Sequence, residues 1–207
     1  MNILAAASPA LMKLFERVGK PRIHNLPDLL KPGGTGAVIV CNHVGWADGL
    51  WMGYAVYPRP LRFLSKQELF ASSMSKWVME QGGSIAIDRT DPSPSSIRAA
   101  IDLLHRGEIM LVFPSGTRSN ESGTFKRGAA TIALRAQVPI VPAYYEGPEK
   151  MRVGHLIGRP QINVTFGDII ATAGRPIDRY SAKIITRLMQ DEIQALRSTA
   201  DARLLAV

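Results

Sequence analysis

Short apolar runs recur along the chain and alternate with longer segments in which apolar residues follow helical spacing. The runs predict strands at residues 37–41, 61–65, 84–87, 109–113, 138–143 and 162–166. Those at 37–41 and 109–113 are apolar throughout, which is typical of strands buried on both faces of a sheet. The last run alternates apolar and polar residues, so we expect it to keep one exposed face.

The segments between these runs predict helices. They cover residues 9–19, 49–57, 67–81, a stretch that begins at Ser95 or Ser96, 127–136 and 178–199. Pro58 and Gly107 are typical residues at which a helix stops. Alternating strands and helices predict an α/β fold: a single domain with a mixed, mainly parallel sheet flanked by helices. Ligands bind at the carboxyl ends of strands in such sheets, so chemistry is expected in the segments that follow the strands.

Composition supports one globular domain. The chain has 207 residues, of which 46% are hydrophobic and 20% are charged. These values allow a sizeable core and exclude disorder as a description of the whole chain. Cys41 is the single cysteine. An intrachain disulfide and a cysteine-built zinc site are therefore excluded, and the scattered histidines show no metal-binding spacing.

The net charge of the chain is +8, from 25 Lys and Arg against 17 Asp and Glu. This excess favours anionic partners: phosphate-bearing substrates, nucleic acid or an anionic membrane surface. No run of consecutive cations is longer than Lys126-Arg127. The lack of a basic arm argues against nucleic acid as a partner.

Residues 1–22 are expected to form an N-terminal amphipathic helical segment, and residues 23–207 to form the main domain. Lys13, Glu16 and Arg17 interrupt the apolar residues of the segment, so it does not read as a membrane-spanning helix. Its positive charges follow the apolar stretch, whereas a signal peptide carries them before it. Two interpretations remain: the apolar face packs on the domain, which the pattern favours, or it lies in a membrane interface.

The segment after the strand at 37–41 contains His43 and Asp48. They are five positions apart, which is about 140° around a continuous helix, so the side chains meet only across a strand-to-helix turn. Gly45 can adopt backbone conformations that other residues cannot, which suits such a turn. A carboxylate on imidazole Nδ1–H leaves Nε2 as a general base for a substrate hydroxyl. The alternative is a structural histidine beside a helix-capping aspartate, and the short pattern alone favours this alternative.

Other polar residues that follow strands suit a phosphate group. They are Ser115, Gly116, Thr117 and Arg118 after the strand at 109–113, Arg89 after the strand at 84–87, and Lys66 after the strand at 61–65. A glycine lets backbone N–H groups approach a phosphate, and an arginine binds it with two parallel hydrogen bonds. The alternative is a polar turn with solvated cations.

Four ordered blocks resemble those of the glycerolipid acyltransferase family, typified by 1-acylglycerol-3-phosphate acyltransferase. Residues 42–48 resemble the NHxxxxD block, residues 83–89 the GxIxIDR block, residues 113–119 the FPEGTRS block and residues 138–142 the VPIVP block. The resemblance covers roughly residues 20–170, so it includes most of the chain.

This resemblance implies transfer of a fatty acyl group to the free hydroxyl of a lysophospholipid, most directly 1-acylglycerol-3-phosphate, to give phosphatidic acid. It implies that His43 deprotonates the acceptor hydroxyl and that Asp48 orients His43. Arg118, Lys66 and Arg89 are implied to hold the acceptor phosphate. The donor is acyl-CoA or acyl-carrier protein, used as a co-substrate, and no cofactor and no metal are implied.

Two departures from the family pattern affect these expectations. Ser115 stands where the third block normally has glutamate, which removes a negative charge and a strong hydrogen-bond acceptor. The acceptor is therefore either lysophosphatidic acid or another single-chain lipid, and a non-catalytic lipid- or phosphate-binding module is the alternative from another class. The long hydrophobic anchor of many members is also missing. This favours a cytoplasmic protein that associates peripherally with the inner face of the membrane.

Overall fold

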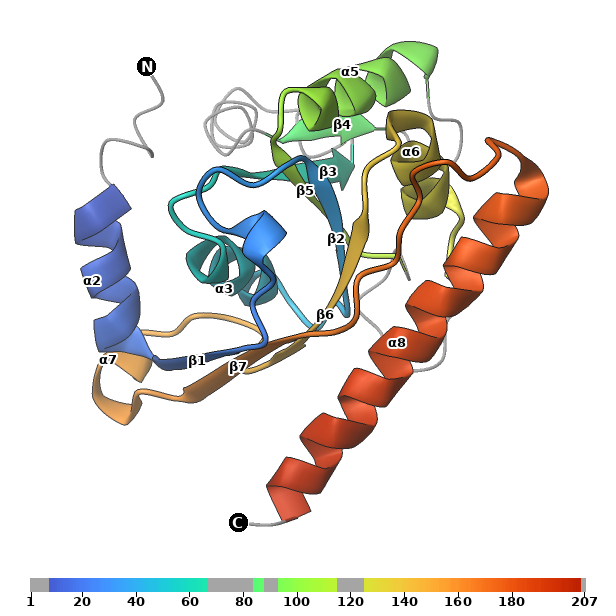
Figure 1. Ribbon diagram of the computed structural model, residues 1–207. Helices are drawn as coiled ribbons and strands as arrows, with labels where there is room; N and C mark the ends of the chain where they lie inside the picture. Colours follow the sequence, from blue (N-terminus) through green and yellow to red (C-terminus); the bar gives the residue numbers. More distant parts are fainter. Residues whose placement is uncertain (1–7, 67–83, 88–92, 115–124, 206–207) are drawn as a thin grey trace.

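The computed structural model describes residues 8–66, 84–87, 93–114 and 125–205 (Figure 1). Its helices are α2 (Ser8–Val18), the 3-10 helix η1 (Asp28–Leu30), α3 (Ala47–Ala55), α5 (Pro94–His105), α6 (Gly128–Ala136), α7 (His155–Gly158) and α8 (Arg179–Leu205). Its strands are β1 (Lys20–His24), β2 (Ala37–Cys41), β3 (Leu61–Lys66), β4 (Ile85–Ile87), β5 (Ile109–Val112), β6 (Ile140–Glu146) and β7 (Gln161–Phe166). The predicted helix at 67–81 lies outside the described residues.

Within the described residues, the strands form one sheet in the order β1-β7-β6-β2-β5-β3-β4. Neighbouring strands are parallel except for β6 and β7, which pair antiparallel. The prediction of a mixed, mainly parallel sheet is therefore confirmed. Because β2, β3, β5 and β6 run in the same direction, their carboxyl ends lie at one edge of the sheet.

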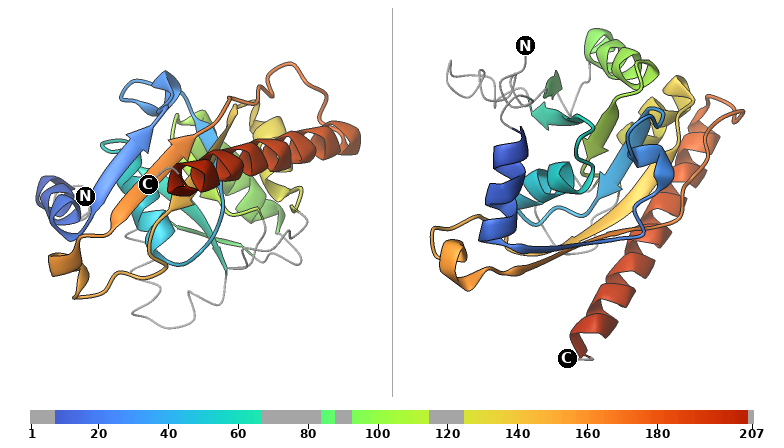
Figure 2. Two further views of the ribbon diagram at one scale, coloured as in Figure 1. Left: turned by 90° about the horizontal axis from the view of Figure 1, so that it is seen from below. Right: turned by 60° about the vertical axis from the view of Figure 1, so that its left-hand side comes forward.

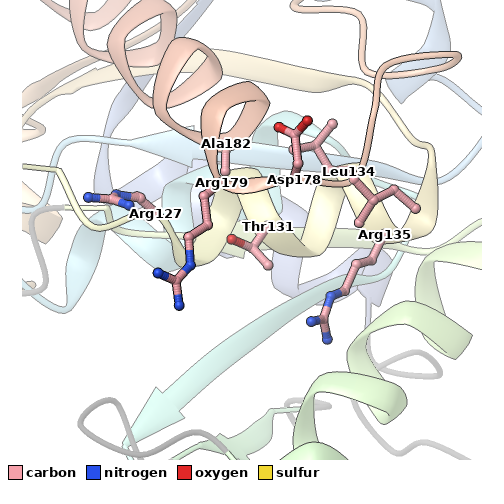
Figure 3. Close-up of a pocket in the computed structure, with 8 residues that line it drawn as sticks. Arg127, Thr131, Leu134, Arg135, Asp178, Arg179 and Ala182 are labelled. Atoms are coloured by element: carbon pink, nitrogen blue, oxygen red, sulfur yellow. The ribbon is translucent and has the colours of Figure 1, made fainter.

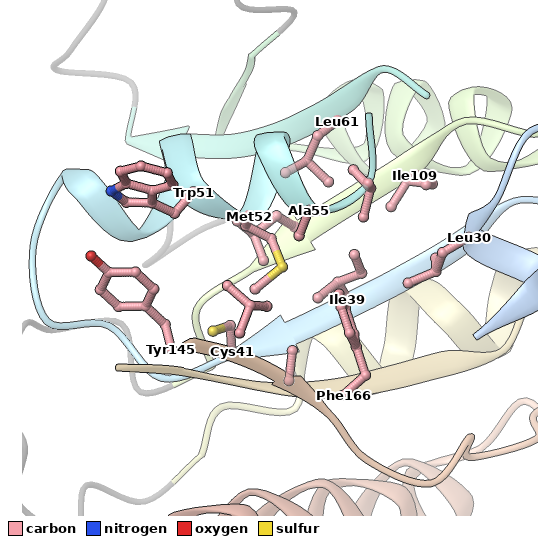
Figure 4. Packing of buried hydrophobic residues seen from close by; sticks show 14 of the residues in the cluster. Leu30, Ile39, Cys41, Trp51, Met52, Ala55, Leu61, Ile109, Tyr145 and Phe166 are labelled. Atoms are coloured by element: carbon pink, nitrogen blue, oxygen red, sulfur yellow. The ribbon is translucent and has the colours of Figure 1, made fainter. Parts of the chain in front are cut away.

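Helices cover both faces of this sheet (Figure 2). Val38 and Val40 of β2 face the core formed with α5, α6 and α8. Ile39 and Cys41 of the same strand face α3 on the other side, where they pack with Met52 (Figure 4). Every residue of β2 is buried, as expected for a strand with a fully apolar sequence.

Some boundaries differ from the sequence-based expectation. The prediction that Ser95 or Ser96 caps α5 is wrong, because the Ser93 hydroxyl accepts the Ser96 backbone N–H at 3.2 Å. Pro94 then occupies the first helical turn, where a missing N–H costs nothing. Gly107 ends this helix as predicted, with a φ of 80° that favours glycine.

The first described helix packs on the domain. Phe15 of α2 is buried, and its ring lies edge-on to Trp51 of α3 with centroids 4.9 Å apart. The chain then enters β1, which pairs in parallel with β7, and the expected boundary between residues 22 and 23 falls inside this strand. None of the helices within the described residues has the length and apolar character needed to cross a bilayer.

Candidate active site

The turn between β2 and α3 brings His43 and Asp48 together. β2 ends at Cys41 and α3 begins at Ala47, so His43 follows the strand and Asp48 lies in the first turn of the helix. His43 Nδ1 and Asp48 Oδ2 are 2.8 Å apart. The Asp48 side chain is only 1% exposed, which strengthens its electrostatic interaction with the imidazole.

Backbone N–H groups fix the Asp48 carboxylate from several directions. Oδ2 accepts hydrogen bonds from Val44 N at 2.9 Å and Gly45 N at 3.1 Å, and Oδ1 accepts one from Gly49 N at 2.6 Å. An ionised carboxylate only accepts hydrogen bonds, so His43 Nδ1 must be the donor in its bond with Asp48. In a neutral imidazole this leaves Nε2 without a proton and available as a base.

The His43 ring is also held by an aromatic neighbour. Phe113 stacks against it with ring centroids 4.1 Å apart and planes 21° from parallel. Phe113 directly follows β5, so the residues after two adjacent parallel strands meet here. Within the described part of the chain, no hydrogen bond occupies His43 Nε2. The ring is therefore fixed in orientation and keeps a ring nitrogen for chemistry.

Gly45 is required by a close approach of the backbone. A Cβ atom at this position would lie 2.0 Å from the carbonyl oxygen of Glu149. The same carbonyl accepts a hydrogen bond from Ala47 N at 3.2 Å. The segment after β6 thus packs directly against the turn that carries His43.

Asn42 ties this turn to β6, a role that the sequence analysis did not assign. Its Nδ2 donates to Tyr145 O at 3.0 Å, and its Oδ1 accepts from Tyr145 N at 2.7 Å. The Tyr145 hydroxyl donates to Pro148 O, and burial raises the pKa of Tyr145, so it stays protonated. The only sequence signal was an amide side chain between the strand end and His43.

The predicted phosphate-binding residues are not placed by the structure. Lys66 is the last residue of β3, and only its backbone is described. Arg89, Ser115, Gly116, Thr117 and Arg118 lie outside the described residues. The strands that precede these residues are parallel to β2 or linked to it through parallel neighbours. Among the described residues, no group of three potential metal ligands is present.

Comparisons with known proteins show the family of the chain. Residues 20–146 match the Acyltransferase family. The chain is 36% identical over 170 residues to a 1-acyl-sn-glycerol-3-phosphate acyltransferase of Bacillus subtilis (strain 168), covering 77% of this chain and 83% of that protein. It is 32% identical over 188 residues to a protein of the same name from Streptococcus pneumoniae (strain ATCC BAA-255 / R6), covering 90% and 69%.

A solved structure shares the fold. The crystal structure of the 1-acyl-sn-glycerophosphate acyltransferase of Thermotoga maritima aligns with a TM-score of 0.56 at 20% identity, covering 92% of this chain and 83% of that one. The family match includes β1 to β6 and the turn that carries His43 and Asp48. The chain therefore belongs to the acyltransferase family.

Proposed function

We propose that this acyltransferase moves a fatty acyl group from a thioester donor to the free hydroxyl of 1-acylglycerol-3-phosphate, which gives phosphatidic acid. The observation that carries the proposal is the His43–Asp48 pair, joined at 2.8 Å and fixed by backbone N–H groups. The names of the B. subtilis and S. pneumoniae relatives support the choice of acceptor.

In the proposed reaction, His43 Nε2 takes the proton of the acceptor hydroxyl as its oxygen attacks the thioester carbonyl carbon. The tetrahedral intermediate collapses, the C–S bond breaks, and the leaving thiolate takes the proton back from His43. Asp48 stabilises the imidazolium that forms between these steps. The reaction draws on no cofactor beyond its two substrates, in keeping with the acyltransferase family.

Arg118, Lys66 and Arg89 are the proposed ligands of the acceptor phosphate. Support comes from the direction of the strands: β3, β4 and β5 run parallel within the sheet that carries His43 at the end of β2. Ser115, Gly116 and Thr117 belong to the same proposed site. Because Ser115 replaces a glutamate typical of the family, a different single-chain lipid acceptor is the second candidate.

We further propose that the protein associates with the inner face of the membrane through an α2–α7 face, made of Leu14, Val153 and Ile157. Their side chains are 49%, 85% and 91% exposed. Helices α2 and α7 lie next to each other, beside the start of β1 (Figure 2). Arg17 and Arg152, which are near these residues in the sequence, are exposed as well. Exposed apolar residues together with nearby exposed cations in the sequence suit an anionic lipid surface, where both acceptor and product reside.

The experiment incubates purified protein in detergent with acyl-CoA or acyl-carrier protein and a panel of single-chain lipids, and identifies products by mass spectrometry. We expect phosphatidic acid from 1-acylglycerol-3-phosphate, and at least a 100-fold loss of rate with His43→Ala. His105→Ala is the matched control, because the side chain of His105 makes its hydrogen bond to the Ala136 carbonyl on α6 and not to the His43–Asp48 pair. A product from another acceptor alone would correct the substrate. Lipid binding without any product would favour the non-catalytic binding module.

A further inference from the structure

Three arginines line a pocket whose residues lie far along the chain from the His43–Asp48 pair. It lies between α6 and the start of α8 and has a volume of about 390 Å³. The residues that line it are Arg127, Thr131, Leu134, Arg135, Ile177, Asp178, Arg179 and Ala182. Figure 3 shows the arginines on one side of the two helices, with Thr131 between Arg179 and Arg135. Its volume falls in the range of small-molecule sites.

The charges of this pocket are uncompensated. Within the described residues, no ion pair or side-chain hydrogen bond engages Arg127, Arg135 or Arg179. Asp178 is the single carboxylate in the lining, and its Oδ1 already accepts the Ser181 backbone N–H at 2.7 Å. The pocket therefore has three guanidinium groups and one carboxylate, which is already hydrogen-bonded to the backbone. Its net charge is positive, which favours an anionic ligand.

One of the arginines, Arg127, also lies where helix electrostatics disfavours a cation. Arg127 is the N-cap residue of α6, and this helix has no acidic residue in its first turn. At the start of α8, by contrast, Asp178 precedes Arg179 and caps the helix by accepting the Ser181 backbone N–H. The N-terminal end of a helix carries a partial positive charge, so a cation there is unfavourable unless an anion accompanies it. The cation at the start of α6 has no carboxylate of its own helix beside it, so this end of the pocket favours an anionic ligand.

Apolar side chains make the pocket suitable for more than an isolated phosphate. Leu134 and Ala182 are buried beneath it, and Ile177 is 60% exposed at its side. A ligand that combines phosphate groups with a flat, weakly polar ring system contacts both parts of such a site. Nucleoside phosphates have this combination.

Contacts within the described chain connect this pocket to the candidate base. Arg127 follows Lys126, whose backbone N–H donates to Pro114 O at 3.0 Å. Pro114 follows Phe113, the residue that stacks on His43. One end of the pocket thus begins near the sheet edge at which acyl transfer is proposed. In a CoA thioester, a long pantetheine arm separates the acyl carbonyl from the phosphates, so the two ends of one donor fit two separate sites.

We propose that the pocket between α6 and α8 binds the phosphorylated adenosine of an acyl-CoA donor. This inference rests on the proposed acyl transfer, and it selects CoA over a carrier protein as the donor. Arg127 and Arg179 contact its phosphates, while Leu134 and Ala182 support the adenine. None of these residues takes part in the chemical step, so they determine donor affinity and not turnover.

The test uses the double variant Arg127→Ala/Arg179→Ala in the full chain. Arg187→Ala is the matched control, because Arg187 is an exposed arginine two turns further along α8 and pairs with Asp191 at 3.9 Å. Direct binding of adenosine 3′,5′-bisphosphate is measured by calorimetry. We expect at least about a tenfold weaker affinity in the double variant, since each lost charged hydrogen bond costs about that factor, and no change in the control.

Kinetics with two donors supply the second measurement. The KM for acyl-CoA rises by about tenfold or more in the double variant with kcat kept, while the KM for acyl-pantetheine, which lacks phosphates and nucleotide, stays the same. Equal nucleotide binding by wild type and double variant would overturn the proposal. The proposal would also be overturned if the double variant raised the KM for acyl-carrier protein while the wild type bound no nucleotide. Binding of phosphatidic acid vesicles through these arginines, without binding of nucleotide, would overturn it as well. If no donor is turned over yet nucleotide binding still needs the arginines, the proposed acyl transfer fails and the pocket assignment stands.

Discussion

At the scale of single residues, Asp48 combines two roles that the sequence presents as alternatives. Its carboxylate accepts backbone N–H groups of the turn, as a structural aspartate does, and it also accepts His43 Nδ1–H. The same hydrogen bonds that hold the turn therefore hold the carboxylate against the imidazole. Stability and the orientation of the proposed base depend on one side chain.

Replacing Asp48 by asparagine separates these roles. The amide keeps one acceptor oxygen but places an NH₂ group against donors on its other side and removes the charge that stabilises an imidazolium. We expect kcat to fall by at least about 100-fold and the free energy of unfolding to drop by about 1–3 kcal/mol. Acyl transfer assays and urea unfolding measure both effects. Asp102→Asn, at an exposed position on α5, is the control. A normal kcat in the Asp48→Asn variant would contradict the prediction and would mean that Asp48 has only a structural role.

A second residue-scale prediction concerns Gly45. An alanine Cβ would lie 2.0 Å from Glu149 O, so either the turn or the segment after β6 must shift. A shift of the turn displaces His43, and we expect kcat to fall by about tenfold or more, because catalytic geometry tolerates little displacement. The expected loss of stability is about 1–3 kcal/mol, the range for strained substitutions.

Gly53→Ala is the matched control, because nothing lies within 4 Å of a Cβ built at this position of α3. In a helix interior alanine is favoured over glycine, so this variant should be more stable by about 0.5–1 kcal/mol, with unchanged kcat. Thermal unfolding and steady-state kinetics of the two variants give the comparison. Equal behaviour of the two alanines would contradict the close approach at Gly45.

At the scale of elements, the sequence predicts those strands and helices whose apolar residues follow a regular period along the chain. β2 and β5 are recognisable because central parallel strands are apolar on both faces. β1 is missed because it lies at the sheet edge and alternates charged and partly buried residues, and α7 is too short to show helical periodicity. Residues that are buried only because a neighbouring element packs on them do not produce a periodic pattern in their own segment.

The same limit applies to the candidate site. The His43–Asp48 pair is predictable because a strand, a glycine and a helix start lie within a few residues. The contact between Asn42 and Tyr145 joins positions 103 residues apart, so spacing along the chain does not reveal it. The arginine pocket likewise combines α6 with α8, whose sequences separately read as ordinary amphipathic helices.

The α2–α7 face carries a prediction at the same scale. Ile157→Asp places a charge on a side chain that is 91% exposed, so the fold should be unaffected while insertion into the lipid interface is disfavoured. We expect binding to vesicles that contain phosphatidic acid to weaken by several-fold, measured by co-sedimentation. Ile169→Asp is the control, since Ile169 is also exposed but lies after β7, outside this face. Equal weakening in both variants would argue against a defined membrane-binding face.

For the whole molecule, we expect the net charge of +8 to act on both proposed substrates and on an anionic membrane surface at once. The acceptor phosphate, the nucleotide of the proposed donor and an anionic bilayer are all negative, so one field attracts each of them. The proposed chemical step depends instead on Asp48, which is almost fully shielded from solvent. Attraction and catalysis should therefore respond differently to salt.

Raising the ionic strength from about 0.02 to about 0.3 M shortens the screening length to below about 10 Å and weakens attraction between exposed charges. We expect the KM values for acyl-CoA and for 1-acylglycerol-3-phosphate to rise by several-fold, while kcat changes little because buried pairs are screened far less. Steady-state kinetics over a salt series, with the melting temperature followed in the same buffers, test this. A fall in kcat at constant KM and constant melting temperature would mean that salt reaches the catalytic pair itself, and that the positive surface does not recruit the substrates.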